Sequence, residues 1–142
     1  MIMSKKYKVG YTTGVYDMFH IGHLNIIKRA KEQCEYLIVG VTTDELCYAR
    51  KNKYPIINQN DRMEIVNSIK FVDKAVLQEN MDKLSAVKKY GIDVVFVGSD
   101  WQGTPAWEKY EKEFAAEGCS VVYLSHTDGI SSTILRERLN NQ

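Results

Sequence analysis

The chain has 142 residues, of which 44% are hydrophobic and 26% are charged, and its formal net charge is +1. This composition gives no sign of disorder and predicts one domain, residues 1–142, with one sizeable core. The balanced charge gives no broad electrostatic reason to bind nucleic acid or an anionic membrane, so we expect a small-molecule ligand.

The N-terminus and the cysteines both bear on cellular location. The first eight residues, Met-Ile-Met-Ser-Lys-Lys-Tyr-Lys, lack an apolar signal core. No stretch approaches the roughly 20 apolar residues that span a bilayer. Cys34, Cys47 and Cys119 are odd in number and widely spaced, which favours reduced thiols over a disulfide framework or a zinc site. We therefore expect a cytoplasmic protein without membrane insertion.

Short β-rich runs alternate with helical patterns along the chain. In chain order, the patterns predict a strand at 7–12, a helix at 22–34, a strand at 36–42, a polar and basic loop at 46–58, a helix from about 60 to 69, a strand at 74–77, a helix at 82–90, a strand at 94–98, a helix at 105–117, a strand at 120–124 and a helix at 131–139. This alternation predicts an α/β fold with one mostly parallel, five-stranded sheet and helices on both faces.

Chemically rich residues fall in the predicted strand-to-helix connections. These are the segments 13–23, 44–53, 99–103 and 126–133. In open parallel sheets, ligands bind beyond the carboxyl ends of the strands, so we expect these four loops to face one crevice. A Rossmann Gly-x-Gly-x-x-Gly motif and a Walker-type phosphate loop are both absent from the sequence.

The segment 14–23, Gly-Val-Tyr-Asp-Met-Phe-His-Ile-Gly-His, is the most informative part of the chain. His20 and His23 are three residues apart at the start of a predicted helix, so both side chains should point to the same side. Gly22 allows another group to approach the backbone closely. A helix N-terminus offers unpaired N–H groups and a partial positive charge. These features predict a site for a phosphate chain, at which the two imidazoles stabilise a transferring phosphoryl group.

A second helix beginning has similar chemistry. The segment 126–133 reads His-Thr-Asp-Gly-Ile-Ser-Ser-Thr, in which a flexible glycine precedes three hydroxyl residues. Hydroxyls at a helix N-terminus can bind phosphate oxygens, and the alternative is a plain helix cap that uses the same groups.

These motifs resemble the cytidylyltransferases of the His-x-Gly-His nucleotidyltransferase superfamily, in particular the small glycerol-3-phosphate cytidylyltransferases. The second motif is similar to the family's Arg-Thr-Glu-Gly-Ile-Ser-Thr-Thr, and segment 98–103 is similar to its Gly-Asp-Asp-Trp-Glu-Gly. Segment 57–62 looks more like the corresponding stretch of choline- and ethanolamine-phosphate enzymes. The resemblance covers nearly the whole chain. It implies a Rossmann-like domain that transfers CMP from CTP to a phosphorylated alcohol, with glycerol 3-phosphate as the first choice, by direct in-line attack with release of pyrophosphate.

The resemblance also implies roles for particular residues. His20 and His23 are the expected catalytic residues, together with a lysine of the second loop, for which Lys51 and Lys53 are equal candidates. The expected nucleotide-binding residues are Thr13, Gly14, Val15, Tyr16, Ile21, Gly22, Asp100, His126, Thr127, Asp128, Gly129, Ile130, Ser131, Ser132 and Thr133. The expected acceptor contacts are Arg50, Glu79 and Trp101. Mg²⁺ is expected mainly on the phosphates of CTP, without a metal site made by the protein alone, and a homodimer is expected by analogy.

Two departures from the family pattern leave more than one function open. His126 stands where the family has an arginine, so a fixed bidentate cation is replaced. Glu79 stands about where glycerol-phosphate members have a lysine, and a carboxylate there would suit an amine-bearing acceptor of the phosphoethanolamine or phosphocholine type. The sequence also leaves open an adenylyltransferase of the same superfamily and a non-catalytic nucleotide-sensing module.

Overall fold

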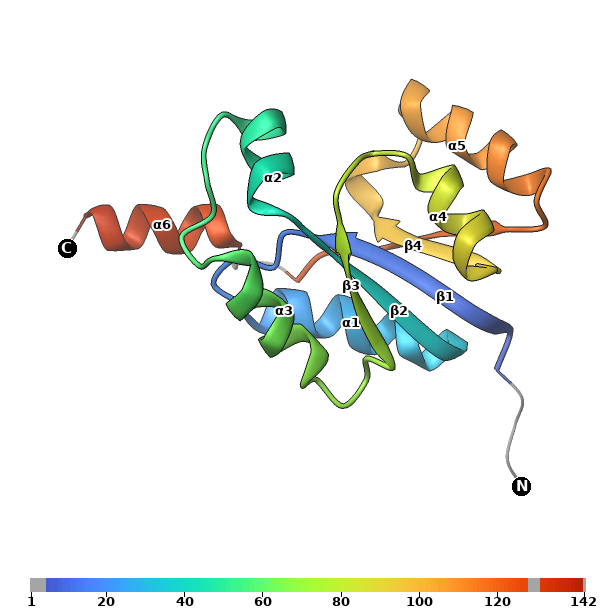
Figure 1. The fold of residues 1–142 in the computed structure, drawn as a ribbon, viewed down its shortest axis with the longest axis horizontal. Helices are drawn as coiled ribbons and strands as arrows, with labels where there is room; N and C mark the ends of the chain where they lie inside the picture. The colour runs from blue at the N-terminus through green and yellow to red at the C-terminus, as the bar shows by residue number, and fades with distance from the viewer. Residues whose placement is uncertain (1–4, 128–130, 142) are drawn as a thin grey trace.

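The computed structural model describes residues 5–127 and 131–141, and Figure 1 shows their arrangement. Its elements in chain order are β1 (Tyr7–Gly14), α1 (Ile21–Gln33), β2 (Cys34–Thr42), α2 (Asp44–Lys51), α3 (Gln59–Asn67), β3 (Lys74–Gln78), α4 (Lys83–Tyr90), β4 (Val94–Gly98), the short 3-10 helix η1 (Ser99–Trp101), α5 (Pro105–Ala115), β5 (Ser120–Leu124) and α6 (Ser132–Asn140).

The five strands form one sheet in the order β3-β2-β1-β4-β5, and every neighbouring pair is parallel. The strand order reverses between β1 and β4, which is where open parallel sheets bind ligands beyond the carboxyl ends of their strands. Figure 1 shows α2 and α6 at this end of the sheet. The predicted α/β, Rossmann-like fold is confirmed.

Two hydrophobic clusters hold helices against the two faces of the sheet. Ile27 of α1 and Val66 of α3 belong to the first cluster, whereas Val87 of α4 and Phe114 of α5 belong to the second. The buried residues of β2 divide between the two clusters because successive side chains of a strand point to opposite faces. A sheet covered on both faces therefore explains the nearly continuous apolar run in this strand.

The predicted loop at 46–58 is wrong for its first half, which belongs to α2. Thr43 caps this helix by accepting a hydrogen bond from the N–H of Leu46, and Asn52 ends it in the left-handed conformation with φ 58°. Acidic residues in the first turn and basic residues in the last turn also suit the helix dipole. Because caps and charges stabilise this short helix, it forms without a long apolar period in its sequence.

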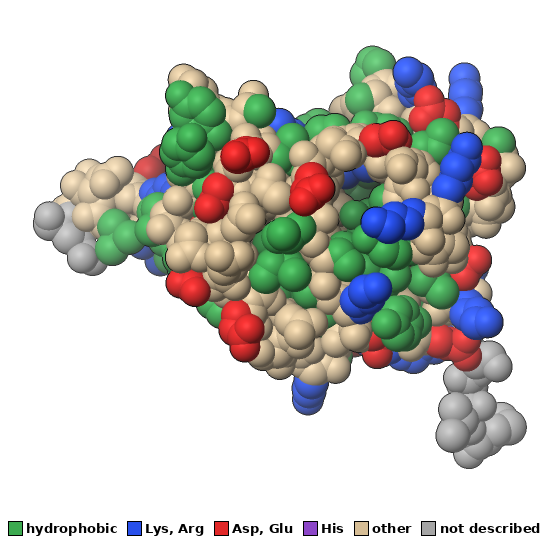
Figure 2. Space-filling view, in the orientation of Figure 1, with side chains coloured by type: hydrophobic (Ala, Val, Ile, Leu, Met, Phe, Trp, Pro, Cys, Tyr) green, Lys and Arg blue, Asp and Glu red, His purple; other side chains and the backbone are tan. Residues whose placement is uncertain are grey.

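The face of the molecule in Figure 2 carries charges of both signs, and the three cysteines are buried. Figure 2 shows acidic and basic side chains interspersed on the face in view, in keeping with the net charge of +1. Cys34, Cys47 and Cys119 are free and buried. Within 5–127 and 131–141, the structure has no helix of the length and hydropathy that a bilayer crossing requires.

Candidate active site

The connection between β1 and α1 has a strained backbone. Tyr16 and Met18 have φ values of 56° and 48°, in the left-handed region that residues other than glycine rarely adopt. A Cβ atom on Gly14 would lie 2.9 Å from the Tyr16 ring, so glycine lets this ring lie over the backbone. Such conformations persist only where the surrounding structure holds them, and they are common in ligand-binding loops.

His20 and His23 cap α1 reciprocally. The Nδ1 atom of His20 accepts from the N–H of Gly22 at 3.1 Å, and the Nδ1 atom of His23 accepts from the N–H of His20 at 3.3 Å. The two rings stack with their centroids 3.8 Å apart, so they point to the same side, as the spacing predicted. Because each Nδ1 accepts a hydrogen bond, each neutral ring carries its proton on Nε2 and presents an N–H donor there.

Partial burial favours this neutral form of both rings. It lowers the pKa of His23 to about 4, with the neighbouring His20 adding to the effect, and it lowers the pKa of His20 as well. The Nε2 atom of His20 is buried and has no hydrogen-bond partner among the described residues. A buried N–H without an acceptor costs about 1–3 kcal/mol, so its natural partner is a ligand oxygen.

This burial predicts a pH dependence of stability. An imidazole in the unfolded chain takes up a proton below about pH 6.5, whereas the folded His23, with a pKa of about 4, stays neutral. The unfolded state therefore binds more protons between these values, and the free energy of unfolding should fall by about 2 kcal/mol as pH is lowered from 6.5 to 4. Urea titrations at several pH values would measure this slope. A slope of equal size in His23→Gln would contradict its assignment to His23.

The start of α6 lies against the first loop. Ser131 is the N-cap of α6, and the Oγ–H of Ser132 donates to the backbone oxygen of Asp17 at 2.7 Å. On the other side, Asn25 of α1 donates through Nδ2 to Oγ1 of Thr127 at 2.8 Å. Two helix N-termini, each with a partial positive charge, are thus brought together as the sequence predicted.

Asp17 is a buried carboxylate that the sequence patterns did not indicate. It accepts from the backbone N–H groups of Ile56 and Ile57, each at 2.9 Å, and forms an ion pair with Arg136 of α6. Burial alone would raise the pKa of Asp17, but these donors outweigh it and hold the pKa below its usual value. Asp17 therefore ties the histidine loop to the segment that follows α2 and to α6.

Lys83 is a second residue that the sequence patterns did not indicate. It is only 8% exposed, its Nζ donates to Oγ1 of Thr13 at 3.2 Å, and it lies 5.7 Å from the centroid of the Trp107 ring. Burial lowers the pKa of Lys83 to about 8, and the charge of Arg50 adds to this shift. A buried ammonium without a carboxylate partner in the described structure favours an anionic ligand. Its position in the sequence could have indicated a functional role, because a positive charge in the first turn of a helix is unfavourable beside the positive end of the helix dipole.

His126 packs over the backbone at the end of β4. A Cβ atom on Gly98 would lie 2.7 Å from Nε2 of His126, so glycine is needed for this ring position. The same Nε2 lies 3.1 Å from the carboxylate of Asp100, and both side chains are largely exposed. Gly98 and Asp100 therefore orient the His126 ring.

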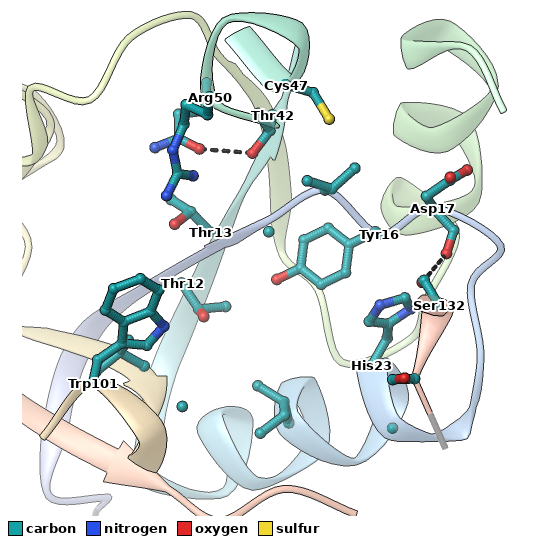
Figure 3. A pocket seen from close by; sticks show the side chains of 18 of the residues that line it. Thr12, Thr13, Tyr16, Asp17, His23, Thr42, Cys47, Arg50, Trp101 and Ser132 are labelled. Atoms are coloured by element: carbon teal, nitrogen blue, oxygen red, sulfur yellow. Dashed lines mark hydrogen bonds between the residues drawn. The ribbon is translucent and has the colours of Figure 1, made fainter. Parts of the chain in front are cut away.

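These groups surround one cavity of about 840 Å³ at the carboxyl ends of the strands. Figure 3 shows one side of the cavity with Tyr16, His23, Asp17 and Ser132. Arg50, Thr13 and Trp101 lie across from them. The predicted site residues that line this cavity are Thr13, Gly14, Val15, Tyr16, His20, Gly22, His23, Arg50, Lys51, Lys53, Trp101, His126, Thr127, Ser131, Ser132 and Thr133. The four predicted loops therefore face a single cavity.

Three predicted site residues lie away from this cavity wall. Ile21 is 53% exposed, and Asp100 contacts His126 from outside the lining. Glu79 lines a smaller cavity of about 140 Å³ that shares Gln78 and Lys83 with the large one, so its role as an acceptor contact stays a prediction. Gln78 ends β3 and lines both cavities. The predicted residues Asp128, Gly129 and Ile130 lie outside the described residues.

The cavity wall does not form a metal centre by itself. Among the described residues, no group of three or more His, Cys, Asp or Glu side chains could hold a metal ion. Asp17 is the one carboxylate among the described residues that line the cavity, and its oxygens already accept from Arg136 and two backbone N–H groups. The wall is instead rich in N–H donors and cations, which suits a phosphate-bearing ligand.

Comparisons with known proteins agree with this chemistry. The family model described as cytidylyltransferase-like matches residues 11–138. The chain is 36% identical over 127 residues to the glycerol-3-phosphate cytidylyltransferase of Bacillus spizizenii, which covers 89% of this chain and 92% of that protein. It is 32% identical over 130 residues to the FAD synthase of Thermoplasma acidophilum, which covers 89% of this chain and 90% of the relative.

A solved structure from Thermoplasma volcanium, described as a lipopolysaccharide core biosynthesis protein, has the same fold. It superposes with a TM-score of 0.69 at 28% identity, over 84% of this chain and 96% of the other. The family match begins within β1 and spans the other four strands and the described loops around the cavity. The chain therefore belongs to the cytidylyltransferase-like family, and it is a CTP-dependent nucleotidyltransferase.

Proposed function

We propose that this enzyme transfers CMP from CTP to a small phosphorylated alcohol, with glycerol 3-phosphate as the leading acceptor. The products are a CDP-alcohol and pyrophosphate. The observation that carries this proposal is the pair of neutral, partly buried imidazoles that share one cavity with two helix N-termini and several cations.

In the proposed reaction, an oxygen of the acceptor phosphate attacks the α-phosphorus of CTP in line. The new oxygen–phosphorus bond forms as the bond to the α,β-bridging oxygen breaks, and the electron pair leaves with pyrophosphate. No protein nucleophile takes part, so the protein contributes positioning and charge stabilisation. The Nε2–H groups of His20 and His23 donate to phosphate oxygens whose negative charge grows in the transition state.

The electrostatics of the wall support an acceptor whose only charge is its phosphate. Lys83 and Arg50 supply positive charge, and Asp17 is already paired with Arg136. An acceptor ammonium group would find no available carboxylate on the described wall. Glu79, the residue that suggested an amine-bearing acceptor, lines the smaller cavity and not the wall of the large one.

Mg²⁺ and the homodimer remain predictions of this proposal. The described residues form no metal cluster, so Mg²⁺ would be carried by the phosphates of the nucleotide, and no step above is assigned to it. Sedimentation equilibrium would test the predicted homodimer.

The decisive experiment measures pyrophosphate release with CTP or ATP against a panel of acceptors. The panel contains glycerol 3-phosphate, phosphoethanolamine, phosphocholine and FMN, the last because one relative is an FAD synthase. We expect the highest kcat/KM with CTP and glycerol 3-phosphate. Preference for ATP and FMN would contradict the proposal, and CTP binding without release for any pair would support a nucleotide-sensing module instead.

A further inference from the structure

Gln78 has a buried amide with an incomplete set of hydrogen bonds. It ends β3 and is 7% exposed. Its Oε1 accepts from the Oγ1–H of Thr42 at 2.9 Å, a bond drawn beside the Thr42 label in Figure 3. The hydrogen-bond partner of its Nε2 among the described residues is the Sδ atom of Met81, at 3.8 Å. A thioether is a weak acceptor, so this N–H donor lacks a good partner in the described structure.

The Gln78 amide lies at the same edge of the cavity as the buried ammonium of Lys83. Thr42 pairs with Gln78 at the end of β2 and β3, while Thr13 of β1 accepts from Lys83. The strands β1 and β2 are neighbours, and neighbouring strands lie about 5 Å apart. Gln78, Thr42, Thr13 and Lys83 all line the large cavity. One small molecule can therefore contact both the ammonium and the amide.

The two groups select different parts of such a molecule. A buried cation binds a phosphate strongly, whereas a neutral amide N–H can donate to any oxygen with a free lone pair, including the hydroxyl of an acceptor whose phosphate is held by the cation. Leaving the amide N–H unpaired costs about 1–3 kcal/mol, which an acceptor hydroxyl would recover. An ammonium group has no lone pair, so it cannot satisfy this donor.

Resting on the function proposed above, we propose that Gln78 is a specificity-determining residue of the acceptor site. Its Nε2–H donates to a hydroxyl oxygen of the acceptor while Lys83 holds the acceptor phosphate. The site thereby selects hydroxyl-bearing phosphomonoesters over plain alkyl phosphates and over aminoalkyl phosphates.

The test compares kcat/KM for glycerol 3-phosphate and propyl phosphate, which share a three-carbon chain but differ in hydroxyls. We expect the wild type to prefer glycerol 3-phosphate, and Gln78→Met to reduce this ratio by about 10- to 100-fold through loss of glycerol 3-phosphate turnover. The matched control is Gln33→Met at the end of α1, away from the cavity, which should keep the wild-type ratio. A ratio cancels any difference in the fraction of active enzyme.

A second variant covers the case in which Gln78→Met does not fold. Gln78→Glu keeps the size of the side chain but replaces the N–H donor with a carboxylate, so we expect preference to shift from glycerol 3-phosphate toward phosphoethanolamine. Wild-type turnover with unchanged ratios in the folded variants would overturn the role of Gln78 alone. Equal wild-type rates with propyl phosphate would do the same, whereas wild-type inactivity toward every phosphomonoester would overturn the proposed function itself.

Discussion

Replacing His20 or His23 by alanine is expected to lower kcat by about 100- to 1,000-fold, with a smaller change in KM for CTP. Each ring presents a neutral Nε2–H donor, and both residues line the cavity. The Nε2 atom of His20 has no hydrogen-bond partner among the described residues. Removing one preorganised donor that binds growing charge has an effect of this size in other enzymes. Steady-state release of pyrophosphate over a range of CTP concentrations would separate kcat from KM.

The third histidine of the chain provides the matched control. His126 lines the same cavity but lies 3.1 Å from Asp100, outside the stacked pair. We expect His126→Ala to raise KM for CTP more than it lowers kcat. Because His20 also caps α1, His20→Ala should cost about 1 kcal/mol of stability, and its fold should be checked by circular dichroism. A kcat equal to that of the wild type in either His20→Ala or His23→Ala would remove that ring from the proposed mechanism.

Replacing Arg62 by methionine is expected to reduce the free energy of unfolding by about 3–5 kcal/mol. The guanidinium is 1% exposed and donates to the backbone oxygens of Val15, Thr42 and Ile57, and it forms an ion pair with Asp44 at 2.6 Å. Methionine fills part of the space but leaves these acceptors without a donor, and breaking a buried pair from one side has a cost of this order. Urea-induced unfolding would measure it.

Two further variants show whether charge or geometry matters at this position. Arg62→Lys keeps the charge but cannot reproduce the planar set of donors, so we expect it to recover only part of the loss. Arg138→Met, on an exposed position of α6, should change stability by no more than about 0.5 kcal/mol. A loss below about 1 kcal/mol in Arg62→Met would mean that water replaces the guanidinium at little cost.

The sequence predicted the fold because the signals for it are local and repeated. Each strand carries at least one β-branched residue, and the helices start near cap residues such as Asn58 and Ser131. The rule that parallel sheets bind ligands at their carboxyl ends then grouped the right loops around one cavity. The helix α2 was missed because it depends on capping and charge placement, which an apolar period does not report.

The site was only partly predictable because several of its groups act through contacts between distant segments. Asp17 contacts backbone about 40 positions ahead and a helix at the end of the chain. Gln78 reads as an ordinary polar residue in the sequence, and the one sequence signal at Lys83 is its place in the first turn of a helix. The folded structure buries both side chains. It also places Gln78 rather than Glu79 on the wall of the large cavity.

The reciprocal cap between His20 and His23 limits proton transfer through the two rings. Both Nδ1 lone pairs are engaged by backbone N–H groups, so relaying a proton through either ring would require opening the first turn of α1. Neither ring can therefore act as a relay during turnover, and each leaves the reaction in the protonation state in which it entered. A solvent kinetic isotope effect on the transfer step should accordingly be close to unity.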